Sequence, residues 1–210
     1  MNKNEKFAIT INRELGSGGR TVGRLLAERL AVPYYDKALI MALEKKYNLS
    51  VEEIERMKGK SVRWWSDFNR VMRVGENPRL YVEKEGEEPD VVTSEVIFKA
   101  EKEILQAIAQ DESCVIAGRT GFFVLKDHPN HLSILIQASM EHRLERVMRK
   151  KKISEDEARK IIQKVDKMRE EYVSKFAHTS RYDARNYDLV INMDGKTEED
   201  AADLIIRYIG

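Results

Sequence analysis

The sequence predicts an α/β fold in which a parallel sheet of five strands lies between layers of helices. Short apolar runs alternate with longer amphipathic segments along the 210 residues, and a glycine-rich segment follows the first apolar run. Runs of this kind are typical of buried parallel strands. Their alternation with helical segments is typical of a sheet that is covered on both faces.

Each predicted element has its own pattern. The apolar runs that predict strands cover residues 7–11, 33–35, 114–117, 132–138 and 189–193. Between them, residues 21–30 and 94–110 carry apolar side chains at helical spacing. Capping boxes, in which a Ser or Thr and an acid three residues later satisfy free N–H groups, predict further helix starts. They are Ser50 with Glu53, Ser154 with Glu157, and Thr197 with Asp200.

The interval of about residues 38–92 breaks this alternation, because it contains no convincing buried strand. We interpret it as a helical insertion within a single domain that covers residues 1–210. The insertion could cover a substrate, or it could be a decorative or oligomerising subdomain. Trp64 and Trp65 within it could stack on a base, but adjacent aromatic residues more often pack a subdomain or a dimer contact. A homodimer is therefore possible.

Composition limits the classes of function. The chain has 37 Lys and Arg against 36 Asp and Glu, a formal net charge of +1. No strong global field favours nucleic acid or a membrane surface, so we expect neither as a partner and look for local electrostatic function. No apolar segment reaches membrane-spanning length, and the polar start lacks a secretory signal. We expect a cytoplasmic protein.

A phosphate-binding loop is predicted between the first strand and the first helix. Residues 13–21 read Arg-Glu-Leu-Gly-Ser-Gly-Gly-Arg-Thr. In the pattern G-x-x-x-x-G-K-[ST], glycines let backbone N–H groups face the phosphates and the lysine reaches the transferred group. With Gly19-Arg20-Thr21 as the G-K-T end, Glu14 replaces the first glycine and Arg20 replaces the lysine.

The glycines Gly16, Gly18 and Gly19 lead into a helix, where the N-terminal N–H groups and the helix dipole favour an anion. Two other interpretations are open. A dinucleotide-binding turn would use Gly16-Ser17-Gly18 with Asp36 on a ribose hydroxyl, but Thr21 occupies its third glycine position. The segment could also be a glycine-rich turn without a ligand.

A second constellation is basic. Arg143, Arg146 and Arg149 repeat every third residue directly after the fourth predicted strand. Such a row could be a solvated helix face, or it could clamp phosphates. Because a second capped helix returns with Asp166 and Arg169, we predict a lid over about residues 143–176 that closes over polyphosphate and excludes water.

Taken together, these residues resemble the cytidylate kinases. The resemblance rests on the glycine loop, Tyr35-Asp36, Gly118-Arg119 after a strand, the segment Ala138-Ser139-x-Glu141-x-Arg143-x-x-Arg146, and a lid with Asp166 and Arg169. The match is to the divergent cytidylate kinase-like branch, in which Arg-Glu-x-Gly-Ser-Gly-Gly-Arg replaces the ordinary loop. It covers nearly the whole chain.

The resemblance implies a three-layer P-loop kinase fold with a parallel five-stranded sheet, a helical acceptor-binding insertion and a helical lid. It implies transfer of the γ-phosphoryl group of ATP onto CMP, dCMP or a related small acceptor, with Mg²⁺ bridging donor oxygens. Positioning and positive charge supply most of the catalysis in such reactions. We therefore expect arginines to dominate the site.

Roles carried over by the resemblance fall into three groups. Donor-phosphate residues are Gly16, Ser17, Gly18, Gly19, Arg20 and Thr21, with the Thr21 hydroxyl on the magnesium side. Expected catalytic arginines are Arg20, Arg143, Arg146 and Arg169, and expected acceptor-site residues are Asp36, Lys37, Arg119, Asp166 and Arg169.

The chain departs from the ordinary enzymes on the acceptor side. Ala117 and Thr120 stand where those enzymes have Asp, and Lys37 and Ala42 stand where they have Ser and Arg. These changes remove predicted contacts to the cytosine ring, its sugar and its phosphate. Lys37 could supply the ammonium that the loop lacks. A competing hypothesis is a nucleotide-binding regulatory protein that keeps the fold without efficient transfer.

Overall fold

Buried runs rich in β-branched residues form the strands of the computed structural model, which describes residues 1–36 and 95–210. One compact unit comprises residues 1–36 and 105–210, and described residues 95–104 belong to a second unit. The predicted insertion, Lys37, Trp64, Trp65 and the Ser50–Glu53 capping box lie outside the described residues.

A five-stranded sheet with the order β2-β3-β1-β4-β5 forms the centre of the first unit, and each neighbouring pair is parallel. The strands are β1 (Ala8–Arg13), β2 (Tyr34–Tyr35), β3 (Cys114–Ala117), β4 (His131–Gln137) and β5 (Leu189–Asn192). In register, Ile9 of β1 lies opposite Val115 of β3 and Leu132 of β4. The predicted α/β class and the five parallel strands are confirmed.

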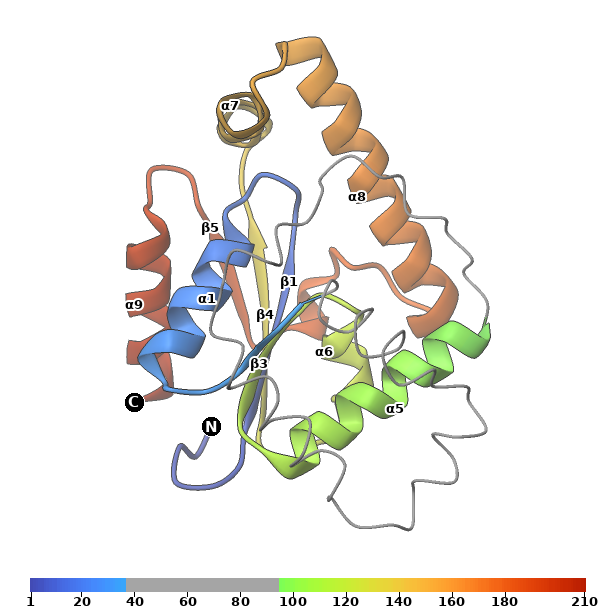
Figure 1. The fold of residues 1–210 in the computed structure, drawn as a ribbon, viewed down its shortest axis with the longest axis vertical. Helices are drawn as coiled ribbons and strands as arrows, with labels where there is room; N and C mark the ends of the chain where they lie inside the picture. Colours follow the sequence, from blue (N-terminus) through green and yellow to red (C-terminus); the bar gives the residue numbers. More distant parts are fainter. Residues whose placement is uncertain (37–94) are drawn as a thin grey trace, which may run out of the picture. The chain divides into compact units, whose positions relative to one another are not determined.

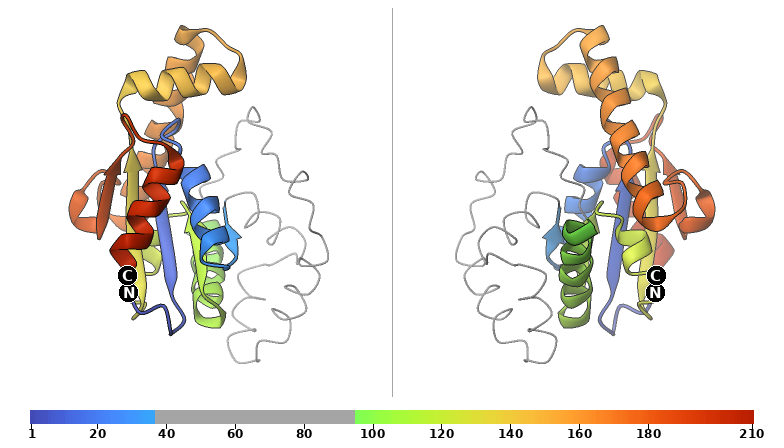
Figure 2. Two further views of the ribbon diagram at one scale, coloured as in Figure 1. Left: turned by 90° about the vertical axis from the view of Figure 1, so that its left-hand side faces the viewer. Right: turned by 90° about the vertical axis from the view of Figure 1, so that its right-hand side faces the viewer.

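Helices cover both faces of this sheet. On one face, α1 (Gly19–Arg29) and α9 (Glu198–Ile209) pack against each other. On the other face lie the short α6 (Gly121–Val124) and the last turns of α5 (Glu95–Asp111). The two views of Figure 2 look onto these two faces. The arrangement gives the three layers that the alternating sequence pattern predicts.

Between the sheet and the α1–α9 layer lies a core of aliphatic side chains. Ile9, Ile11, Val22, Leu26 and Ile205 are all fully buried there. Each full burial of such a side chain contributes about 1.5–3 kcal/mol, so this layer fixes the position of α1 on the sheet. The start of α1, and with it the glycine loop, is held in place by that packing.

Two further helices are α7 (Met140–Lys151) and α8 (Glu155–Ala177). In Figure 1, α7 and the first turns of α8 stand beyond the carboxyl ends of the strands, and α8 then runs down until its last turns pack against α6. The predicted capping boxes are confirmed at Ser154 of α8 and Thr197 of α9. Ser139 caps α7 by accepting a hydrogen bond from the N–H of His142 at 3.3 Å. A 3₁₀ turn, η2 (Ala184–Asn186), leads from α8 into β5.

All the segments that the sequence marks as functional follow the carboxyl ends of strands. The glycine loop follows β1, Asp36 follows β2, and Gly118 follows β3. The start of α7 follows β4, and the loop to α9 follows β5. In open α/β sheets, ligands bind beyond this edge of the strands, so the topology brings the candidate residues to one end of the molecule.

Candidate functional site: a phosphate loop beyond the carboxyl ends of the strands

The glycine loop, residues 14–18, has the backbone of an anion-binding turn. Gly16 and Gly18 have left-handed φ angles of 88° and 84°, which glycine adopts without a steric penalty. A Cβ atom on Gly16 would also lie 2.8 Å from the carbonyl oxygen of Arg143. Gly18 is the N-cap of α1, so the loop leads directly into the positive end of the helix dipole.

Within the described part of the chain, the N–H groups of Gly16, Gly18 and Gly19 donate to no acceptor. The residues Gly18 and Gly19 are buried. Buried N–H groups almost always have partners, so these two free donors, with the N–H of the half-buried Gly16 in the same turn, mark a place for an external acceptor. Phosphate oxygens are acceptors of this kind, and consecutive N–H groups in a glycine turn are a common way to bind them.

A buried ionic cluster holds the loop from one side. Arg143 pairs with Glu14 at 2.9 Å and with Asp166, and its Nε donates to the carbonyl oxygen of Leu15 at 2.9 Å. The N–H of Leu15 donates to Asp166 at 3.0 Å, and the N–H of Ala138 donates to Glu14 at 3.1 Å. The cluster therefore ties the loop to β4, α7 and α8. The expected catalytic role of Arg143 stays a prediction, since here two carboxylates hold its guanidinium.

Two more arginines reach the same cluster from α8 and from the segment after it. Arg169 donates to the carbonyl oxygen of Arg13 at 3.1 Å and lies 3.7 Å from Asp166. Arg181, whose side chain is fully buried, lies 3.4 Å from Asp166 and donates to the same carbonyl oxygen. Sequence reasoning missed Arg181, and no motif around it could have marked it.

Arg20 points away from the loop toward the end of β2. Its Nε and Nη2 donate to one carboxylate oxygen of Asp36 at 3.1 Å and 2.8 Å. The Asp36 side chain is 10% exposed and that of Arg20 is 27% exposed, so the pair is partly shielded from water. The structure thus brings together two residues that the sequence assigned to the donor and acceptor sides.

Arg146 and Glu198 meet above the start of α1. Arg146 donates to the Thr21 hydroxyl at 3.1 Å and pairs with Glu198, the first residue of α9. A Cβ atom on Gly18 would lie 3.4 Å from a carboxylate oxygen of Glu198, so this carboxylate lies close to the N-terminus of α1. An anion therefore already lies at the positive end of the helix. Sequence reasoning missed Glu198, although the Thr197 capping box marks its helix start.

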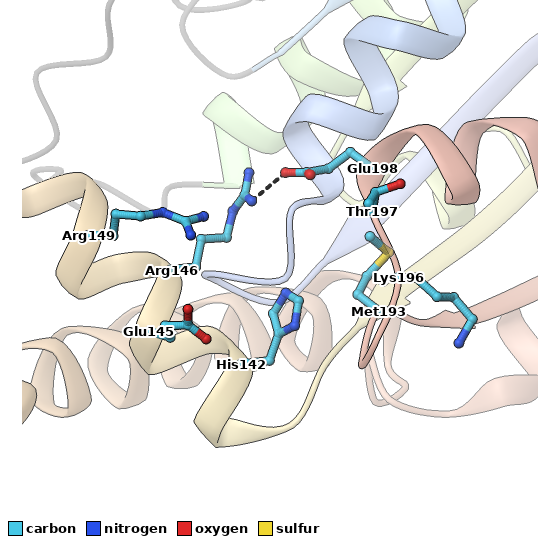
Figure 3. A pocket seen from close by; sticks show the side chains of 8 residues that line it. All are labelled: His142, Glu145, Arg146, Arg149, Met193, Lys196, Thr197 and Glu198. Atoms are coloured by element: carbon cyan, nitrogen blue, oxygen red, sulfur yellow. Dashed lines mark ion pairs between the residues drawn. The ribbon is translucent and has the colours of Figure 1, made fainter.

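Beside this pair is a pocket of about 210 Å³ between α7 and the loop from β5 to α9. Figure 3 shows Arg146 and Arg149 on the α7 side and Glu198 with Thr197 on the other. The lining residues are His142, Glu145, Arg146, Arg149, Met193, Lys196, Thr197 and Glu198. A ligand that binds the glycine loop could extend into this pocket.

The segment that follows β3 has a constrained backbone. Gly118, Arg119 and Thr120 have consecutive left-handed φ angles of 84°, 55° and 54°. Non-glycine residues in this region cost about 1–3 kcal/mol each, and such residues cluster at functional sites. The Thr120 hydroxyl oxygen is buried and has no hydrogen-bond partner in residues 1–36 and 95–210. The expected acceptor residue Arg119 therefore belongs to a strained turn at the same edge of the sheet.

The described residues offer no metal-binding cluster of protein side chains. In the described ranges, His, Cys, Asp and Glu form no group of three that could hold a metal ion. The prediction that Thr21 meets magnesium through a bound nucleotide stays a prediction, and the Thr21 hydroxyl accepts a hydrogen bond from Arg146 in the structure. Over the same ranges, the helices are all too short or too polar to cross a membrane.

Several known proteins are similar to this chain in sequence or in fold. A cytidylate kinase from Sulfolobus acidocaldarius is 24% identical over 202 residues, which cover 96% of this chain and 93% of that enzyme. The crystal structure of an uncharacterized protein from Eubacterium ventriosum is 26% identical, with a TM-score of 0.65 and coverage of 97% and 98%. A shikimate kinase from Bacteroides thetaiotaomicron, 14% identical, shares the fold with a TM-score of 0.50 and the same coverage.

The three-layer fold is that of the P-loop kinases. A model of the cytidylate kinase-like family matches residues 8–195. The chain belongs to the cytidylate kinase-like family. Membership supports a function of nucleotide kinase type and gives no support to the dinucleotide interpretation of the loop.

Proposed function

We propose that the protein is an ATP-dependent phosphotransferase of the nucleoside monophosphate kinase type, with CMP, dCMP or a related small phosphate as acceptor. The observation that carries the proposal is the glycine turn with three N–H donors that lack acceptors in the described ranges. This turn lies at the N-terminus of α1 in a chain of the cytidylate kinase-like family. Both facts favour a bound polyphosphate.

On the donor side, the proposal assigns the phosphates of ATP to the N–H groups of Gly16, Gly18 and Gly19. The pocket beside Arg146 and Arg149 would take the nucleoside portion. Bound Mg²⁺ would neutralise charge on the transferred phosphoryl group. The carboxylate of Glu198 would give way to phosphate oxygens, which would free the Arg146 guanidinium to contact them.

On the acceptor side, Arg119 lies just after β3, and Asp36, which pairs with Arg20 of α1, directly follows the neighbouring strand β2. We propose that these residues face the acceptor, and that Asp166 and Arg169 act on it through the loop that they hold. The lid role of α7 and α8, a cytoplasmic location and a homodimer remain predictions. The identity of the acceptor depends on residues that include Lys37, which lies outside the described part.

A second candidate is a nucleotide-binding regulatory protein with little phosphotransfer. The pair of Arg20 with Asp36 favours it, because a guanidinium held by a carboxylate at 2.8 Å contributes less charge to a phosphate nearby. This candidate uses the same loop and pocket. The two differ only in turnover.

ADP formation decides between them. The wild-type protein is incubated with Mg-ATP and a panel of nucleoside monophosphates, and ATP binding is measured separately by calorimetry. The proposed function requires ADP formation that depends on one of the acceptors. ATP binding without turnover on any acceptor would support the regulatory candidate, and absence of ATP binding would contradict both.

A further inference from the structure

The cation of the ordinary phosphate loop has no direct counterpart at Arg20. In the pattern G-x-x-x-x-G-K-[ST], a glycine precedes the lysine, and a left-handed φ is the conformation that most clearly requires a glycine. Gly18 has such an angle and caps α1, whereas Gly19 is the first residue of the helix and has no positive φ. The register with Gly18 as the second motif glycine therefore places Gly19 at the lysine and Arg13 at the first glycine. It differs by one residue from the register that the sequence alone suggested. In the new register, Arg20 and not Thr21 occupies the Ser/Thr position of the pattern.

Gly19 needs to be glycine because of Arg13, not because of its own backbone. A Cβ atom on Gly19 would lie 2.6 Å from Cβ and 3.2 Å from Cγ of Arg13, and 3.2 Å from Cβ of Ile136, so the contact with the Arg13 Cβ is the closest. Real Cβ atoms do not approach other carbon atoms so closely, so a side chain at this position would force Arg13 to move. The stem of Arg13 thus occupies the space in which the lysine side chain of an ordinary loop would begin.

The far end of the Arg13 side chain reaches the strained turn after β3. A Cβ atom on Gly118 would collide with Nη1 of Arg13 and would lie 3.3 Å from its Cζ. Two glycines, one on α1 and one after β3, therefore leave room for this one side chain. Its guanidinium lies between the first turn of α1 and the end of β3. Arg119 directly follows Gly118 in the sequence.

Hydrogen bonds hold the backbone of Arg13 in place, and its positive charge acts on the neighbouring Tyr34. Its carbonyl oxygen accepts hydrogen bonds from Arg169 at 3.1 Å and from Arg181, so the backbone at the end of β1 is held. Burial raises the pKa of the Tyr34 phenol, and the Arg13 guanidinium opposes that rise more than any other charge. The positive charge of Arg13 is therefore felt beside Tyr34, which precedes the end of β2 by one residue.

We propose that Arg13 supplies the phosphate-binding cation that an ordinary loop obtains from lysine, and that the glycines at positions 19 and 118 leave the space that its side chain needs. The inference rests on the proposed phosphotransfer and names a residue for that same site. In the transfer, the bond from the γ-phosphorus to the ADP oxygen breaks, and that oxygen keeps the electron pair. An oxygen of the acceptor forms the new bond to phosphorus, and Arg13 neutralises oxygen charge without exchanging a proton.

The test compares variants of the full chain. Arg13→Met keeps an unbranched apolar stem but removes the charge, and we expect ADP formation to fall at least about 100-fold with little change in the melting temperature. We expect Gly19→Lys alone to be inactive as well, because its Cβ atom would collide with Cβ of Arg13. The double variant R13G/G19K restores the ordinary G-x-x-x-x-G-K pattern, and we expect it to regain at least about a tenth of the wild-type rate. Arg24→Ala, on the exposed face of α1, is the control and keeps that rate.

Full turnover in Arg13→Met would overturn the proposal. If Arg13→Met does not fold, the double variant decides: a rate below about a tenth of wild type then contradicts the proposal. If the wild type has no turnover at all, the proposed function fails and binding tests Arg13 separately. Arg13→Met should then weaken ATP at least about tenfold and AMP less than about twofold, since AMP lacks the outer phosphates. Equal changes for both nucleotides would contradict the role of Arg13.

Discussion

At the residue scale, Asp166 holds more of the site together than any motif indicates. Its carboxylate accepts from the N–H of Leu15 at 3.0 Å and pairs with the buried Arg143 and Arg181. Asp166→Asn leaves two buried guanidinium groups with less compensating charge, which typically costs about 3–5 kcal/mol. We expect the free energy of unfolding in urea to fall by about 3 kcal/mol.

The neighbouring pair provides the matched control. Lys167 and Glu171 lie 3.9 Å apart on the same helix, with side chains 78% and 64% exposed. Exposed pairs contribute little, so Lys167→Gln should change the free energy of unfolding by less than about 0.5 kcal/mol. Equal effects of the two substitutions would show that the buried cluster contributes no more to stability than an exposed ion pair.

His131, the first residue of β4, predicts a pH dependence of stability. Burial lowers its pKa to about 4, although the nearby Asp188 opposes this effect, and its Nε2 lies 2.7 Å from the Thr10 hydroxyl oxygen. The unfolded chain takes up this proton below pH 6.5, whereas the folded protein does so only near pH 4. Above pH 6.5, His131 therefore does not reduce the free energy of unfolding. As the pH falls from 6.5 toward 4, the free energy of unfolding decreases because the unfolded chain binds the proton more tightly.

Between pH 7.5 and pH 5, this histidine should account for a loss of about 2 kcal/mol in the free energy of unfolding. Urea titrations at both pH values measure the loss, which His131→Gln should largely abolish. His178→Asn, at the exposed C-cap of α8, is the control and should keep the wild-type pH dependence. The same dependence in His131→Gln and in the wild type would disprove the assignment.

At the element scale, the start of α9 governs access to the start of α1. Glu198 follows the Thr197 cap and places its carboxylate near Gly18, where it pairs with Arg146. Glu198→Gln removes an anion that competes with phosphate at the helix N-terminus. Because such an interaction is worth about 1 kcal/mol, the dissociation constant for ATP should fall about fivefold.

Calorimetric titration with ATP measures this change. Glu199→Gln, one residue further along α9 and exposed, is the control and should leave ATP affinity unchanged. Weaker binding of ATP to Glu198→Gln would mean that the carboxylate assists the nucleotide instead of competing with it.

Elements and site differ in how far the sequence predicts them. The five strands and the capping boxes at Ser154 and Thr197 were predictable, because apolar runs and caps are local signals. The glycine loop was predictable for the same reason. Arg181 and Glu198 were not, because their importance comes only from residues brought near them by folding.

The alignment of the glycine loop with the G-x-x-x-x-G-K-[ST] pattern could not be predicted correctly from the sequence either. From the sequence, Arg20 is the natural replacement for lysine because its charge stands next to glycine and threonine. In the structure, Arg20 pairs with Asp36, and the side chain of Arg13 packs against Gly19. Only the φ angles of Gly18 and the space at Gly19 distinguish the two registers, and a sequence records neither.

At the scale of the whole molecule, the parallel sheet places the segments that follow its five strands at the same end as the glycine loop. Family membership indicates a function of nucleotide kinase type. The central claim is that this end of the sheet transfers a phosphoryl group to an acceptor and not merely to water. Removal of Mg²⁺ by a chelator should abolish such transfer, since charge neutralisation at the phosphates is lost.

Phosphorus NMR of the wild-type protein with Mg-ATP and CMP, repeated with other nucleoside monophosphates, tests the claim most directly. The predicted result is the appearance, with at least one acceptor, of ADP and the matching nucleoside diphosphate in equal amounts. Unchanged ATP with all acceptors, or ADP accompanied only by inorganic phosphate, would contradict the claim.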